Sequence, residues 1–258
     1  MTQDSSAEIP IWRRRRAEAF ARHPIVRRPA LRSRFVRFSG AQVSHSVLDI
    51  GTGAGFSAFA LARGSSSVTA VDWRPDLLDL ARREGNRRRI TNLTFVEARP
   101  EALPFPVGTF DIVTSAAAVH HFADPASAVA EMARVCTDGG SVAIEDVVAS
   151  EQGVRARYHN RIERLRDRSH QRLLSLSELL GLLGQAGLLV RRVEVQESIR
   201  EYNEWVGVTR PPARRSEHIR RLLQGSVEQD LSGLTVQSED DTFVFIQQVA
   251  WVLACKPA

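Results

Sequence analysis

The feature that most constrains the fold of this chain is the segment Val47–Phe56, which reads Val-Leu-Asp-Ile-Gly-Thr-Gly-Ala-Gly-Phe. The apolar residues Val47, Leu48 and Ile50 predict a buried strand, and residues 56–62 continue with the pattern of a helix. Three glycines at alternate positions predict a tight turn between these elements, because glycine lacks a Cβ and tolerates positive φ. Such a strand, turn and helix allow the backbone to approach a bound ligand closely.

The glycine spacing separates two classes of ligand. A dinucleotide-binding turn has the pattern G-x-G-x-x-G, with the pyrophosphate at the helix N-terminus. Here the third glycine comes one position early, and Asp49 would place a carboxylate beside the phosphates. The same carboxylate suits a ligand that carries sulfonium and ammonium groups. The turn therefore disfavours a nicotinamide dehydrogenase.

The D-x-G-x-G-x-G pattern resembles the first motif of the class I S-adenosylmethionine (SAM) methyltransferases. Matches at Leu103-Pro104-Phe105 and at Phe110-Asp111 extend this resemblance to the ubiquinone/menaquinone-biosynthesis-like group, the methyltransferase domain 11 type. It covers residues 45–190 well and implies SAM as cofactor and S-adenosylhomocysteine as product. The cofactor-binding positions that it implies in the motif and after the fourth strand are Asp49, Gly51, Thr52, Gly53, Gly55 and Ser115.

A second acid follows the second predicted strand, residues 68–71. Asp72 comes 72 − 51 = 21 residues after Gly51, about the spacing at which an acid meets a ribose. One carboxylate can accept hydrogen bonds from both the 2′ and the 3′ hydroxyl, which suits an unphosphorylated adenosine. Trp73 follows and is expected to pack either beside the adenine or in the core.

The loop after the third strand, residues 93–96, departs from the family pattern. Arg99 stands where the family usually has an acid that accepts from the adenine amino group. Pro100 has no N–H and cannot donate to an adenine ring nitrogen. These two residues occupy adenine-binding positions but lack the usual hydrogen-bonding groups.

Alternating strands and helices that end in two successive strands predict a doubly wound, Rossmann-like α/β sheet. The sixth strand is expected at residues 188–195 and the seventh at 242–254. The resemblance implies seven strands in the order 3-2-1-4-5-7-6, the last one antiparallel. Residues 1–40 are expected to form an N-terminal helical arm, and residues 41–258 a SAM-binding domain with helical cap insertions near 151–172 and 196–238.

Composition limits cellular context and partners. Cys136 and Cys255 form no metal-ligand pattern and suggest a reducing compartment. The sequence contains no run of apolar residues long enough to span a membrane, and no signal-peptide pattern, so we expect a cytoplasmic protein. The net charge is +5, but the basic residues are scattered among 30 acids, which favours solvated helix faces over a nucleic-acid partner. Oligomeric state is left open.

The expected function is methyl transfer from SAM to carbon or oxygen of a small molecule, without a metal ion. Acceptors that are protonated at neutral pH need a base. His120 follows the fourth strand and Asp146 ends the fifth, so both lie at the edge of the sheet where ligands bind. They are the predicted catalytic pair, and His170 in the first insertion is the reserve candidate.

Two alternatives are set against this function. The chain could use a SAM-binding fold for chemistry other than methylation, and Arg99 and Pro100 are the residues that favour this. Methylation of a nucleic acid is disfavoured, because the fourth strand leads into Thr114-Ser115-Ala116-Ala117 rather than the D/N-P-P-Y motif of amino-methylating enzymes.

Overall fold

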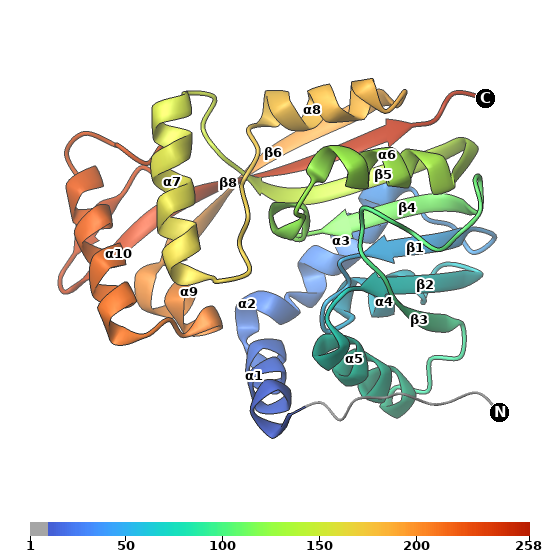
Figure 1. The fold of residues 1–258 in the computed structure, drawn as a ribbon, viewed down its shortest axis with the longest axis horizontal. Coiled ribbons are helices and arrows are strands. Elements are labelled where there is room, and N and C mark those ends of the chain that lie inside the picture. Colours follow the sequence, from blue (N-terminus) through green and yellow to red (C-terminus); the bar gives the residue numbers. More distant parts are fainter. Residues whose placement is uncertain (1–9) are drawn as a thin grey trace.

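The computed structural model describes residues 10–258, so the first nine residues of the expected N-terminal arm lie outside the described residues. One mixed sheet has the order β3-β2-β1-β4-β5-β8-β6, with β7 paired to β8 (Figure 1). The strands β1 to β5 run parallel, and β8 is antiparallel to both β5 and β6, which confirms the predicted order and the antiparallel last strand. The strand bounds are β1 Ser46–Ile50, β2 Ser67–Asp72, β3 Leu93–Glu97, β4 Phe110–Ala116, β5 Cys136–Val148, β6 Leu189–Glu201, β7 Gln237–Glu239 and β8 Thr242–Cys255.

The far end of the sheet differs from the prediction. β6 continues to Glu201 instead of ending near residue 195, and the short β7 adds an eighth strand. β6 and β8 pair with each other beyond the end of β5, as far as Glu201 opposite Val244. In this extension exposed and more buried residues alternate, so it lacks the continuous apolar run of a central strand.

Helices cover both faces of the sheet. Helices α3 and α4 pack on one face and α6 and α8 on the other, while α5 packs on β2 and β3 (Figure 1). The helix bounds are α1 Ile11–Arg22, α2 Pro24–Arg27, α3 Pro29–Ser39, α4 Phe56–Leu61, α5 Pro75–Arg87, η1 Val119–His121 (a 3-10 turn), α6 Pro125–Val135, α7 Gly153–Arg166, α8 Leu176–Gln185, α9 Tyr202–Thr209 and α10 Ala213–Ser226.

Alternation along the strands divides the main core in two. Leu48 and Ile50 of β1 belong to the cluster under α6 and α8, whereas Val47 packs with Ala58 and Leu61 of α4 on the opposite face. The sequence also contains the helix-start signals that the structure uses. Asp124 caps α6, and Ser175 forms a capping box with Glu178 at α8.

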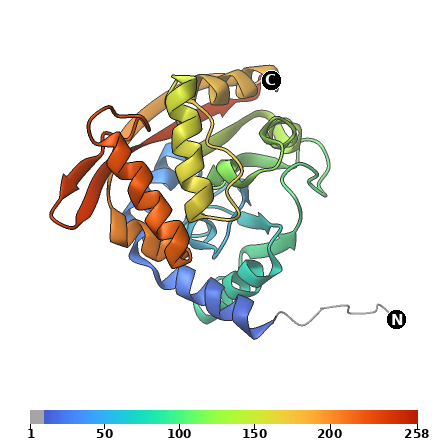
Figure 2. The ribbon, with the colours of Figure 1, turned by 60° about the vertical axis from the view of Figure 1, so that its left-hand side comes forward.

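A smaller core lies beyond the ends of the parallel strands. Helices α7, α9 and α10 pack there against the extended end of β8, and Figure 2 shows α7 and α10 side by side. We call these three helices, with β7 and the extended ends of β6 and β8, the cap. Its core residues are Ile162, Tyr202, Trp205, Ile219, Leu222, Leu223, Leu234, Val236, Phe243 and Phe245. Within residues 10–258, none of the helices has the length and apolar character needed to cross a membrane.

Candidate active site

The glycine turn after β1 combines close packing with one open position. Gly51 has φ +70°, and a Cβ there would come within 2.4 Å of the Cβ of Ala118. Gly53 has φ +55°, but a Cβ there would have no atom within 4 Å. Gly51 and Gly53 line a cavity of about 690 Å³, as does Thr52 between them. Gly55 does not line it, because it packs against Phe59 and Ala81 instead.

Two acids support this turn. Asp49 is 1% exposed and accepts a hydrogen bond from Thr114 Oγ1 at 2.9 Å, while its Oδ2 has no hydrogen-bond partner within residues 10–258. Burial raises the pKa of Asp49 to about 6. Asp72, at the end of β2, accepts from the backbone N–H of Gly53 at 2.8 Å and of Arg74 at 2.9 Å. Its carboxylate therefore fixes the turn against β2, and its remaining lone pairs stay available on the cavity wall.

The loops after β2 and β3 place only some of the predicted adenine-binding residues on the cavity wall. Trp73 is 45% exposed and lines the cavity, as does the buried Pro100. Arg99 does not line it, since its exposed side chain lies over the Trp73 ring with 5.8 Å between Cζ and the ring centroid. Ser115 is fully buried within β4 and does not reach the cavity either.

The sheet brings His120 and Asp146 together. His120 Nδ1 lies 2.6 Å from Asp146 Oδ1, and the backbone N–H of His120 donates to Asp146 Oδ2 at 3.0 Å. Burial lowers the pKa of His120, but the charge of Asp146 and the hydrogen bond to it outweigh this, so the pKa is raised overall. Both residues line the cavity. They form a histidine–carboxylate pair that can hold a proton.

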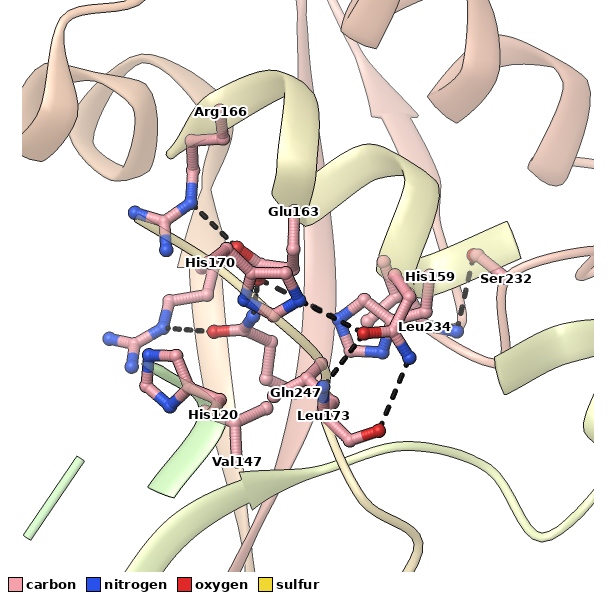
Figure 3. Close-up of polar contacts among 12 residues, drawn as sticks. His120, Val147, His159, Glu163, Arg166, His170, Leu173, Ser232, Leu234 and Gln247 are labelled. Atoms are coloured by element: carbon pink, nitrogen blue, oxygen red, sulfur yellow. Dashed lines mark hydrogen bonds and ion pairs between the residues drawn. The ribbon is translucent and has the colours of Figure 1, made fainter. Parts of the chain in front are cut away.

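Two further histidines lie beside this pair. The ring centroids of His121 and His170 lie 4.1 and 5.6 Å from that of His120. Burial lowers the pKa of His121 to about 4 and that of His170 to about 3, so both are neutral at pH 7. His170 does not line the cavity, and its Nε2 bonds Asn160 Oδ1 at 2.9 Å (Figure 3). Since Asn160 also bonds the backbone N–H and C=O of Leu173, this contact holds the loop after α7 in place.

Comparison with known proteins identifies the family. A profile described as a methyltransferase domain matches residues 48–144. The uncharacterized methyltransferase YcgJ of Bacillus subtilis is 33% identical over 71% of this chain and 73% of its own length. Its crystal structure has a TM-score of 0.84 and 28% identity, covering 89% of this chain and 98% of that one. A demethylmenaquinone methyltransferase of Thermus thermophilus is 36% identical over 44% of this chain and 52% of its own length.

The chain belongs to the SAM-dependent methyltransferases.

The described residues of this methyltransferase fit SAM as the cofactor. The open side of Gly53 leaves room for a ligand against the backbone. Asp72 offers a carboxylate to hydroxyl groups, and the unpartnered Asp49 Oδ2 lies in the strand below the turn. Between residues 10 and 258 no cluster of three or more His, Cys, Asp or Glu side chains is arranged to hold a metal ion.

Sequence reasoning missed several charged residues of the methyltransferase cavity. Arg32 of α3 pairs with the buried Glu145 of β5 at 3.3 Å. Glu163 of α7 accepts from Arg166 Nε and from Gln247 Nε2, both at 2.8 Å (Figure 3). Glu145 directly precedes the predicted catalytic Asp146, and this doubled acid at a strand end was a usable signal. The other residues come from distant segments that only the tertiary fold brings together.

Proposed function

We propose that this methyltransferase methylates an oxygen or carbon atom of a small molecule, with His120 as general base. The observation that carries the proposal is the His120–Asp146 pair on the wall of the cavity that the glycine turn and Asp72 also line. The cofactor supplies an electrophilic methyl group. The protein must then hold the acceptor in line and remove its proton.

The hydrogen bonds of the pair support this role. When Nδ1–H donates to Asp146, Nε2 is the ring nitrogen left to accept a proton from the acceptor. Asp146 is held in place by the backbone N–H groups of His120 and Val147. Its charge favours the imidazolium that forms, which is the same effect that raises the pKa of His120.

For the cofactor we propose that Asp72 accepts from the ribose hydroxyls and that Gly53 lets the ligand approach the backbone. The carboxylate of Asp49 would favour the cationic end of SAM. Pro100 and Trp73 would flank the adenine without reading its polar edge. Asp72, Gly53, Pro100 and Trp73 are assigned from their positions on the cavity wall, and Asp49 from its place in the strand directly before the turn.

We further propose that the arm and the cap cover the substrates and exclude water. Ala17, Phe20 and Leu31 of the arm and Trp205 and Val208 of the cap line the same cavity as His120. A covered cavity suits a small acceptor better than a nucleic acid. We place the enzyme in the cytoplasm because Cys136 and Cys255 are both free thiols.

The non-methylating alternative rested on Arg99 and Pro100. Arg99 does not line the cavity and reaches it only through its contact with the Trp73 ring, so Pro100, which lacks one backbone donor, is the remaining support for this alternative. We therefore favour methyl transfer.

The test is S-adenosylhomocysteine release from SAM with phenols, enols and other acidic acceptors, followed by comparison of variants. His120→Ala should lower turnover by about 10² to 10⁴ with SAM affinity unchanged. The backbone C=O of His120, which accepts from Gln171 and Arg172, stays in place in this variant. His218→Ala, on α10 and outside the cavity, is the matched control.

The pH profile adds a second readout. A base must be neutral to act, so wild-type turnover should fall as the pH drops below the raised pKa of His120. His120→Ala should lack this acidic limb. Undiminished turnover of His120→Ala at neutral pH would contradict the assignment.

A further inference from the structure

The wall of the cavity contains a buried cation without a counter-ion among its hydrogen-bond partners. Arg200, near the end of β6, is 8% exposed. Its Nε donates to Gln247 Oε1 at 3.0 Å, and Nη1 is buried with no hydrogen-bond partner in the described part of the chain. An unpaired buried charge is costly, so a guanidinium kept in this state needs an explanation.

The carboxylate that Gln247 links to Arg200 is already paired with another arginine. Glu163 holds the ion pair with Arg166 and also accepts from Gln247, the residue that bonds Arg200. Burial, then repulsion from Arg28 and Arg166, lowers the pKa of Arg200 to about 10. Glu163 and Glu204 act in the opposite direction, but in the described part of the chain neither forms a hydrogen bond or ion pair with Arg200. Arg200 remains charged at neutral pH.

Other unsatisfied donors line the same cavity. The indole Nε1 of Trp251 and the Nε of Arg32 are both buried without a hydrogen-bond partner in the described chain. Trp251 lies on β8 at an even spacing from Gln247, so both point to the same face of the sheet. Ser198, opposite Gln247, and Arg200 occupy that face on β6. A ligand that carries acceptor oxygens can satisfy groups of this kind.

This wall is electrostatically coupled to the proposed base. Glu163 and Arg166 act on the protonation of both His120 and Arg200. Figure 3 shows His120, Glu163, Arg166 and Gln247 in one cluster. A molecule that fills the cavity can thus have its reacting atom at His120 and a charged group at Arg200.

We propose that the methyl acceptor carries an oxyanion, a carboxylate or a phosphate ester, that pairs with Arg200. This rests on the proposed function, in that it takes this part of the cavity as the acceptor site. The planar guanidinium presents two parallel N–H groups to two oxygens, and the pair becomes strong where water is excluded.

Direct binding tests the proposal without methyl transfer. Benzoate, phenyl phosphate and neutral benzamide are titrated into the full-length protein saturated with S-adenosylhomocysteine, at constant ionic strength, with calorimetric detection. Wild type should bind at least one anion about tenfold or more tightly than benzamide. The benzoate and phenyl phosphate arms distinguish the two kinds of oxyanion. Equal affinity for benzamide and both anions, or no anion binding, would overturn the proposal.

Variants localise the effect. Arg200→Gln should weaken anion binding about ten- to a hundredfold and leave benzamide unaffected. Arg200→Lys keeps the charge but not the pair of parallel N–H groups, so it should retain only part of the preference. Arg157→Gln removes the same charge from an exposed position of α7 outside the cavity and should bind as wild type does. Unchanged anion affinity in Arg200→Gln would refute the site. Because no turnover is measured, a failed His120 assignment leaves these results intact.

Thermal unfolding separates ligand binding from a structural role. If Arg200 is held for a ligand, Arg200→Gln without added anion should be at least as stable as wild type, because an uncompensated buried charge is removed. Added anion should raise the melting temperature of wild type but not of Arg200→Gln. A variant several degrees less stable than wild type would show that Arg200 serves the fold and would overturn the proposal.

Discussion

Two glycines of the turn after β1 should respond to the same substitution in different ways. Alanine in the left-handed region costs about 1–2 kcal/mol. At Gly53 this is the whole expected cost, since a Cβ there meets no atom within 4 Å. At Gly51 the Cβ would lie 2.4 Å from the Ala118 Cβ, so overpacking of about 1–3 kcal/mol is added. Gly51→Ala should therefore lose about 2–5 kcal/mol of unfolding free energy.

For SAM affinity, Gly53 should be the informative position of the two. The methyl group of Gly53→Ala would project into open space on the cavity wall, where the cofactor is expected to contact the backbone. SAM binding should weaken at least about tenfold although the fold loses only about 1–2 kcal/mol of unfolding free energy.

Denaturant unfolding measures the first quantity and calorimetric titration of SAM the second. Gly64→Ala is the matched control, because Gly64 has ordinary backbone angles, lies outside the turn and also has open space around its Cβ position. It should change neither quantity appreciably. If Gly53→Ala binds SAM as tightly as Gly64→Ala does, the turn is not the cofactor cradle. If Gly51→Ala is as stable as Gly53→Ala, the steric reasoning is wrong.

Two more predictions follow from single side chains. Asp72→Asn should weaken SAM binding about ten- to a hundredfold in calorimetry, since a charge-assisted hydrogen bond contributes about 1.5–3 kcal/mol, and unchanged affinity would remove Asp72 from the cofactor site. His170 has a pKa of about 3 in the folded protein against its ordinary 6.5, so at pH 5 it is neutral when folded but protonated when unfolded. The free energy of unfolding therefore decreases as the pH falls below 6.5. In denaturant unfolding near pH 5, His170→Gln should depend on pH less steeply than wild type, by about 1.4 kcal/mol per pH unit; equal slopes would show that His170 titrates normally in the fold.

Local sequence patterns were enough to locate the proposed site residues that lie next to strand ends. The motif from Asp49 to Gly55 and the position of Asp72 depend on a few consecutive residues and on one crossover, because parallel strands must end at the same edge of a sheet. The same rule brought His120 and Asp146 together, although it could not supply their 2.6 Å contact. The family resemblance also implied Ser115 in the site, but β4 is buried on both faces over residues 112–115 and Ser115 does not line the cavity.

What only the tertiary structure decided is the chemistry of the far wall of the cavity. Arg32 meets Glu145 across 113 residues of sequence, Gln247 meets Glu163 across 84, and Arg200 meets Gln247 across 47. Each of these residues alone looks like an ordinary surface residue, and Arg200 falls in a polar stretch that sequence reasoning expected to be helical. Their roles arise from burial, since removal from water makes the difference between a paired and an unpaired charge large. Sequence alone therefore located the residues of the proposed cofactor half of the site, whereas the charges of the proposed acceptor half depend on how distant segments fold against one another.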